Sequence, residues 1–98
     1  MIYIIFDMWT LYEKKSLGKI LRKIPTPILK QYELWKRIVE LEGPTSLRRI
    51  KGYHDEALKG TWLGYRSSRL TLKWRVIYQE TKHKELEIYV IDINPHDY

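Results

Sequence analysis

The chain has 98 residues, enough for one compact domain and too few for a multidomain enzyme. Hydrophobic residues make up 44% of it and aromatic residues 13%, which excludes an intrinsically disordered chain. The formal net charge is +6, and the absence of cysteine excludes disulfide scaffolds, cysteine-ligated zinc and thiol nucleophiles. We therefore expect a single domain over residues 1–98.

Charged residues interrupt the chain throughout, so no apolar stretch approaches the roughly 18–20 residues of a membrane span. The apolar segment 1–6 has no basic segment before it and no small-residue cleavage site after it, so it lacks the pattern of a signal peptide. These features predict a cytoplasmic protein that does not bind membranes.

The first half of the chain begins with a strand, expected somewhere within residues 2–12. A short helix is expected over residues 16–23, because Ser16 can cap it and apolar residues recur at helical spacing. Pro25 ends this helix, since proline lacks the N–H that the next helical hydrogen bond requires.

A second, longer helix is expected directly afterwards. Thr26 supplies a hydroxyl cap and Pro27 occupies the first helical position, where proline is favoured. The pair Gly43-Pro44 predicts its end, as a left-handed cap followed by a residue that cannot continue the helix. The apolar stripe of this helix is Ile28, Tyr32, Trp35, Ile38 and Val39.

The second half of the chain predicts antiparallel strands. Residues 61–70 form the first, with Gly64 as a candidate bulge, and residues 73–80 and 85–93 are rich in β-branched and aromatic residues. Residues 81–84 are expected to form the hairpin turn between the last two strands, and residues 45–59 a polar connection that can hold a helical turn. The predicted fold class is α+β, with an N-terminal strand and a two-helix hairpin packed on a C-terminal antiparallel three-stranded meander.

The positive charge is concentrated in the middle of the sequence. Residues 48–75 carry eight Lys and Arg residues against two acids, while residues 76–98 carry an excess of acids. Basic side chains interleaved with Tyr53, Trp62 and Tyr65 suit a nucleic acid, whose phosphates they neutralise and whose bases can stack. An ordinary solvated basic face explains the same composition equally well.

No motif predicts a metal site or a cofactor. His54, His83 and His96 are far apart and lack a second ligand at helical or turn spacing, and the chain has no phosphate-binding glycine loop, nucleophile elbow or dinucleotide fingerprint. Acid–base and cationic groups remain in the second half. They are Glu56, Arg66, Arg69, Arg75, His96 and Tyr98.

Four segments in this half resemble, in their order and spacing, the RelE/HigB/YoeB-like toxins of bacterial type II toxin–antitoxin systems, within the RelE/ParE superfamily. The segments are Leu58-Lys59-Gly60, Tyr65-Arg66-Ser67-Ser68, Trp74-Arg75-Val76-Ile77-Tyr78 and the run from Tyr89 to Tyr98. The order of the predicted elements is also that of the family, so the resemblance covers nearly the whole chain. It implies an mRNA endonuclease (an interferase) that acts in the ribosomal decoding site and is silenced by an antitoxin protein.

The resemblance also implies the roles of individual residues. In such an enzyme a ribose 2′-hydroxyl attacks the adjacent phosphate, which requires a base, cations and an acid but neither a metal nor a cofactor. Arg75 matches the strand arginine of the family, Arg66 a second basic strand residue, and Glu56 a general-base glutamate. His96 and Tyr98 match the terminal acid–base pair. The residues expected to bind messenger or ribosomal RNA are Arg48, Arg49, Lys51, Lys59, Arg69 and Lys73.

Both ends of the chain depart from the family pattern. Relatives often continue past the position of Tyr98 with basic residues, and their first strand begins near Met8, so residues 1–7 are a candidate extension. Two other functions remain open: a ParE-like gyrase inhibitor that cuts nothing, and a degenerate module that binds RNA or antitoxin without catalysis.

Overall fold

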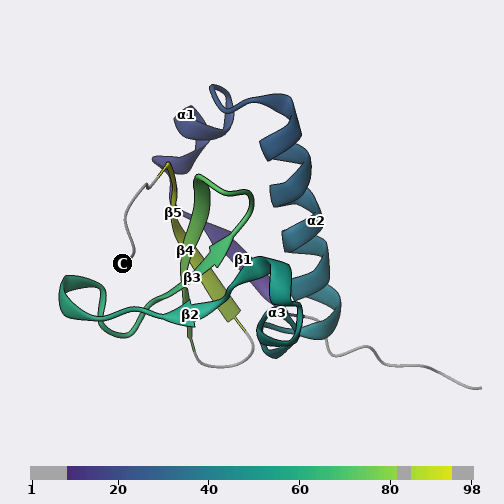
Figure 1. The fold of residues 1–98 in the computed structure, drawn as a ribbon. Helices are drawn as coiled ribbons and strands as arrows, with labels where there is room; N and C mark the ends of the chain where they lie inside the picture. Colours follow the sequence, from purple (N-terminus) through teal and green to yellow (C-terminus); the bar gives the residue numbers. More distant parts are fainter. Residues whose placement is uncertain (1–8, 82–84, 94–98) are drawn as a thin grey trace, which may run out of the picture.

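The computed structural model describes residues 9–81 and 85–93 (Figure 1). The candidate extension 1–7, most of the predicted turn 81–84, and His83, His96 and Tyr98 lie outside the described residues. The elements are β1 (Thr10–Glu13), α1 (Leu17–Leu21), α2 (Thr26–Glu42), α3 (Thr45–Arg49), the 3-10 turn η1 (Lys51–Tyr53), β2 (Glu56–Ala57), the 3-10 turn η2 (Gly60–Trp62), β3 (Arg66–Arg69), β4 (Trp74–Glu80) and β5 (Glu85–Ile93).

The sheet has five strands in the order β1-β5-β4-β3-β2. The predicted meander is present as β3, β4 and β5, which pair antiparallel, and the α+β fold class is confirmed. Two further strands, β1 and β2, extend the meander at its two edges. β1 pairs parallel with β5, with Thr10 opposite Glu85, and the two-residue β2 pairs antiparallel with β3.

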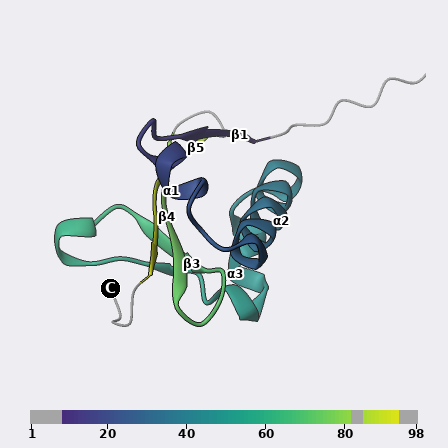
Figure 2. The same cartoon turned by 90° about the horizontal axis from the view of Figure 1, so that it is seen from above.

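The helices cover one face of this sheet. Figure 2 shows α2 and α3 on one side of β3 and β4, and the loop that contains η2 on the other side. The core lies between α2 and the sheet. Trp35 is fully buried there, stacked on Tyr32 with 6.1 Å between ring centroids and edge-on to Tyr78 at 5.4 Å. The predicted stripe of α2 supplies this contact, since Ile28 and Val39 are also buried. None of the helices in the described part of the chain is long and apolar enough to cross a membrane.

The capping predictions for the helices were wrong in detail. Neither Ser16 nor Thr26 makes a side-chain capping hydrogen bond, and α2 already includes Thr26 as its first residue. Pro25, with φ −57° and ψ 145°, takes the position before the helix, because its fixed φ suits that place and its carbonyl accepts from the amides of Ile28 and Leu29.

The end of α2 was predicted at the right place, but Gly43 is not the left-handed cap expected there, because its ψ is 169°. Gly43 has a φ of +82°, which a side chain would strain. The indole of Trp9 also packs against this glycine so closely that an added Cβ would lie 2.6 Å from its Nε1. The amide of Trp9 donates to the carbonyl of Glu40 at 3.0 Å, so the entry to β1 is tied to the last turn of α2.

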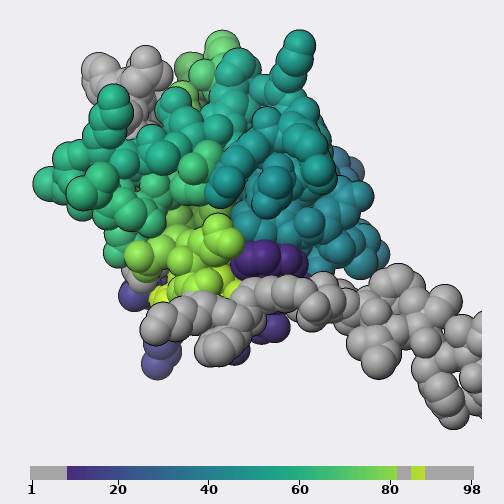
Figure 3. All heavy atoms as spheres, turned by 90° about the horizontal axis from the view of Figure 1, so that it is seen from below, coloured from purple at the N-terminus to yellow at the C-terminus, as the bar shows by residue number. Residues whose placement is uncertain are grey.

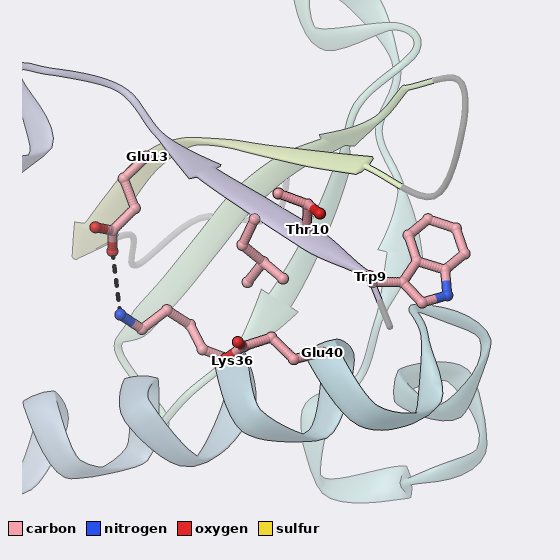
Figure 4. Close-up of a pocket in the computed structure, with 6 residues that line it drawn as sticks. Trp9, Thr10, Glu13, Lys36 and Glu40 are labelled. Carbon is pink, nitrogen blue, oxygen red and sulfur yellow. Dashed lines mark hydrogen bonds and ion pairs between the residues drawn. The ribbon is translucent and has the colours of Figure 1, made fainter. Parts of the chain in front are cut away.

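A second set of contacts joins β1 to the middle of α2. The hydroxyl of Tyr32 donates to Glu13, and Lys36 lies 3.4 Å from the same carboxylate. On the lower surface β1 emerges between α2 and the neighbouring strands (Figure 3). A cavity of about 400 Å³ opens between β1 and α2 (Figure 4). It is lined by Trp9, Thr10, Leu11, Glu13, Lys36 and Glu40.

The strand predicted over residues 61–70 has only four residues in the structure. β3 begins at Arg66, and the residues before it form η2 and a tight loop. Gly60 and Gly64 have φ angles of +66° and +96°, which turn the chain back instead of extending it. Gly64 therefore belongs to a loop and not to a bulge. The predicted polar connection 45–59 does contain helical turns, and it also supplies β2.

Candidate active site

The candidate residues separate onto two faces of the sheet. Side chains alternate between faces along a strand, and residues directly opposite each other on paired strands share a face. Glu56 lies opposite Ser67 on β3, and Arg69 lies opposite Arg75 on β4. These residues therefore occupy the face away from α2, here called the Arg75 face. It comprises Glu56, Ser67, Arg69, Arg75, Ile77 and Gln79.

Arg75 lies at the floor of this face. Its side chain is 4% exposed, and its Nη1 lies 3.5 Å from the hydroxyl of Ser67 and 3.9 Å from the carboxylate of Glu56. The Glu56 side chain is 51% exposed, so the acid stands at the rim and the guanidinium beneath it. Of the five predicted catalytic residues, the structure brings Arg75 and Glu56 together.

Arg69 adds a second positive charge to the same face. It lies directly opposite Arg75, and its Nε is buried with no hydrogen-bond partner among the described residues. Two like charges in opposed positions repel each other, and a buried unpaired N–H is unfavourable. An anion bound between Arg69 and Arg75 would relieve both effects, which makes this pair a candidate phosphate site.

Arg66 lies on the opposite face, toward the helices. Its Nε donates to Oδ1 of Asp55 at 2.7 Å, and it pairs in register with Tyr78, whose ring contacts Trp35 of α2. Burial alone would lower the pKa of Arg66, but the hydrogen bond and the negative charge of Asp55 outweigh it and raise that pKa. The structure does not bring Arg66 and Arg75 together.

Asp55 is the structurally important residue that the sequence analysis missed. Its side chain is fully buried and accepts hydrogen bonds from Arg66, from Ser68 at 2.5 Å and from the hydroxyl of Tyr78 at 2.6 Å. One carboxylate thus ties the start of β2 to β3 and β4. The sequence signal was weak, because a lone aspartate in a polar loop is usually solvated.

The backbone before Asp55 explains how this carboxylate enters the sheet. His54 has a φ of +42°, and no other described non-glycine residue has a positive φ. This left-handed residue ends η1 and turns the chain into β2. Asp55 and Glu56 then follow with opposite directions, one toward the helices and one toward Arg75.

The predicted RNA-binding residues are spread over the surface. Arg48, Arg49 and Lys51 are exposed on α3 and η1, where Arg48 lies 3.8 Å from Glu80. Lys59 is exposed in the loop between β2 and β3, and Lys73 in the turn between β3 and β4. Across the described residues, no three His, Asp or Glu side chains are grouped so that they could hold a metal ion.

Comparison with known proteins identifies the fold. No family model matches the chain, and no curated protein matches it. Solved structures do. A RelE–RelB complex from Pyrococcus horikoshii matches with a TM-score of 0.72 and 23% identity, over 92% of this chain and 99% of that one.

Two bacterial toxins give similar results. A YafQ variant from E. coli matches with a TM-score of 0.68 and 19% identity, over 88% of this chain and 93% of that one. A YoeB–YefM complex from Staphylococcus aureus matches with a TM-score of 0.67 and 14% identity, over 92% of this chain and 98% of that one. The resemblance indicated by the sequence motifs is therefore confirmed in three dimensions: this chain has the fold of the RelE, YoeB and YafQ toxins.

Proposed function

We propose that the chain is the toxin of a type II toxin–antitoxin pair, an endoribonuclease that cleaves mRNA in the ribosomal decoding site. The observation that carries this proposal is the placement of Arg69 directly opposite Arg75, with Glu56 at the rim 3.9 Å from Arg75. Two guanidinium groups offer several fixed N–H donors to the oxygens of one phosphate, and a carboxylate beside them can accept a proton.

The proposed reaction needs no metal ion. The ribose 2′-oxygen forms a bond to the adjacent phosphorus while the bond from phosphorus to the 5′-oxygen breaks, leaving a 2′,3′-cyclic phosphate and a 5′-hydroxyl. A base takes the proton of the 2′-hydroxyl, and an acid gives one to the leaving 5′-oxygen. Arg75 and Arg69 stabilise the charge that develops on the phosphate oxygens.

Glu56 is the proposed base, because its carboxylate is exposed beside the phosphate site. The phosphate replaces Glu56 as the partner of the Arg75 guanidinium, which frees the carboxylate for proton transfer. His96 and Tyr98 remain the proposed acid–base pair at the leaving oxygen, from the family resemblance alone. Arg66, bound to Asp55, is proposed to hold the sheet rather than to touch RNA.

The proposed RNA contacts divide by position. Arg69 lies on the Arg75 face, and Lys59 and Lys73 lie in the loops on either side of β3; all three are proposed to contact the message. Arg48, Arg49 and Lys51 lie on α3 and η1 and are proposed to contact ribosomal RNA. Such contacts position the complex without reading its sequence.

An antitoxin is the proposed protein partner. The solved relatives from Pyrococcus horikoshii and Staphylococcus aureus are toxins in complex with RelB and YefM. For this chain we propose an acidic or helix-rich partner that covers the Arg75 face or displaces the C-terminal residues, because a chain with a net charge of +6 attracts acidic segments.

The test is to map new mRNA 5′ ends in a bacterial host after brief induction. The wild type is compared with Arg75→Ala, His96→Ala and the control Arg37→Ala, which changes an exposed arginine on α2. We expect new ends inside translated reading frames with the wild type and the control, and none with the first two variants. Growth arrest with intact mRNA would favour gyrase inhibition instead, and neither arrest nor cleavage would favour a non-catalytic module.

A further inference from the structure

The loop between β2 and β3, residues 58–65, carries two aromatic rings beside the Arg75 face. Trp62 and Tyr65 contact each other edge-to-face, with 5.2 Å between ring centroids and 88° between ring planes. Both are partly exposed. An edge-to-face contact covers one face of only one ring, so the pair retains ring surface for another flat group.

The loop holds these rings in a defined place. The amide of Leu58 donates to the carbonyl of Tyr65 at 2.9 Å, which closes the loop. Inside the loop, the backbone amide of Trp62 donates to the carbonyl of Lys59 at 3.3 Å, and the backbone amide of Tyr65 donates to the carbonyl of Trp62 at 2.9 Å. Because the backbone is hydrogen-bonded at each of these points, binding a ligand on the rings would cost little ordering of the loop.

The position of the loop places the rings next to the candidate phosphate site. A Cβ added at Gly64 would lie 3.9 Å from the side-chain amide of Gln79, so the loop folds against the Arg75 face. Tyr65 immediately precedes β3, and the hydrogen bond from Leu58 to its carbonyl continues the register in which Ala57 lies opposite Arg66. In an extended chain, residues two apart, such as Tyr65 and Ser67, point to the same side and lie about 7 Å apart. Ser67 in turn contacts Arg75. One nucleotide can span this separation.

The surroundings of the rings suit an RNA base. Lys59 is exposed at the start of the loop and can neutralise a backbone phosphate. We propose that Trp62 and Tyr65 form a stacking site for an unpaired RNA base next to the phosphate bound by Arg75. This inference rests on the proposed function, and it assigns to the loop the recognition of a base, which the arginines on the sheet do not provide.

The first test measures binding of a fluorescein-labelled, ten-nucleotide 2′-O-methyl RNA, which cannot be cleaved, to the purified chain. Trp62→Ala and Tyr65→Ala are expected to raise the Kd by about 5- to 150-fold each, the range measured for loss of one base–aromatic stack. Trp62→Phe and Tyr65→Phe keep a ring and should stay within about threefold of the wild type. Leu63→Ala, in the same loop with a 76% exposed side chain, is the matched control and should bind as the wild type.

Two further readouts separate stacking from a loss of charge or of folding. Stacking releases no counterions, so the alanine variants should keep the slope of log K against log salt, while Arg69→Ala should reduce it by about one. RNA with abasic sites should bind the wild type as weakly as normal RNA binds Trp62→Ala, and the two changes together should have little additional effect.

The outcomes distinguish this inference from the proposed function. If the alanine variants bind RNA like the wild type while Arg75→Ala binds less, the stacking site is wrong and the nuclease remains. If the alanine variants keep their RNA affinity but no longer bind an antitoxin, the loop is a protein interface and the stacking site is again wrong. If the wild type binds no RNA and leaves mRNA intact in cells, the proposed function itself fails.

Discussion

Asp55 and Glu56 are adjacent in sequence, but their side chains point to opposite faces of the sheet, because successive residues of an extended chain alternate between faces. Asp55 is buried and accepts three side-chain hydrogen bonds, while Glu56 is half exposed beside Arg75. The two residues therefore offer a matched pair of variants, in which the same chemical change is made one residue apart.

We expect Asp55→Asn and Asp55→Ala to destabilise the fold, the alanine variant by about 2–4 kcal/mol, because Arg66, Ser68 and Tyr78 lose a charged acceptor. Glu56→Gln should change the free energy of unfolding by less than about 0.5 kcal/mol. Urea denaturation measures both. Equal stability of the Asp55 and Glu56 variants would contradict the anchoring role of Asp55.

Glu56→Gln should instead lower mRNA cleavage in cells at unchanged protein level, by about 100-fold or more if the carboxylate is the general base. The measurement is the mapping of new 5′ ends, normalised to the amount of folded protein. Wild-type cleavage by this variant would remove Glu56 from the proposed mechanism while leaving the phosphate site intact.

Two buried tyrosines predict a loss of stability at alkaline pH. Burial raises the pKa of Tyr78 well above its ordinary value of 10.0, and the nearby negative charge of Asp55 raises it further. Burial does the same for Tyr32, with Glu13 as its hydrogen-bond partner. Both remain protonated in the folded chain while the unfolded chain ionises, so their contribution is complete below pH 10 and is lost as the pH rises above it.

The free energy of unfolding should therefore fall above pH 10 by up to about 1.4 kcal/mol per pH unit for each of these tyrosines. Tyr32→Phe and Tyr78→Phe should each make this fall shallower by one such increment, relative to their own stability at pH 8. Denaturation at a series of pH values measures the slope. An unchanged slope in both variants would show that other groups cause the alkaline loss.

At the scale of elements, helix α2 and strands β4 and β5 were predictable because each carries a strong local pattern. The apolar stripe from Ile28 to Val39 fixes one face of α2, and β5 matches its predicted bounds of residues 85–93. β2 and η2 were not predictable in this way. The two residues of β2 are held by the hydrogen bonds of Asp55 and by pairing with β3. These contacts join residues far apart in the sequence, so no local pattern predicts them.

In the candidate site, too, local features were predictable and contacts between strands were not. The types of residue were readable from the sequence, but the closeness of Glu56 and Arg75 was not, because it depends on the pairing of β2 with β3. The separation of Arg66 from Arg75 was not, because it depends on the register between β3 and β4, in which Arg66 lies opposite Tyr78 and Arg69 lies opposite Arg75. Pairing register decides which side chains of two strands share a face.

The junction between α2 and β1 gives a prediction for a single glycine. Gly43→Ala should lower the free energy of unfolding by about 1–3 kcal/mol, because the φ of +82° is strained for alanine and its Cβ would press on Trp9. Gly52→Ala is the control, since its φ is not positive and an added Cβ has nothing within 4 Å. Thermal unfolding compares them, and equal midpoints would contradict this account.

At the scale of the whole molecule, β5 joins the two ends of the fold. It lies between β1 and β4, and it pairs with both. A chain that ends after Thr81 keeps the described helices but loses this strand, so β1 loses the strand it pairs with and the core residue Leu86 is missing. We expect that chain to show no cooperative thermal unfolding by circular dichroism. A cooperative transition would show that α2 and the remaining strands fold without it.

The pairing of Thr10 with Glu85 also has a consequence for folding during synthesis. A ribosome synthesises β1 well before β5, so the sheet cannot close until β5 has left the exit tunnel. Arg75 gains its own neighbour on β5 at the same late moment. If the chain is the proposed nuclease, its candidate phosphate site would be complete only once β5 has joined the sheet.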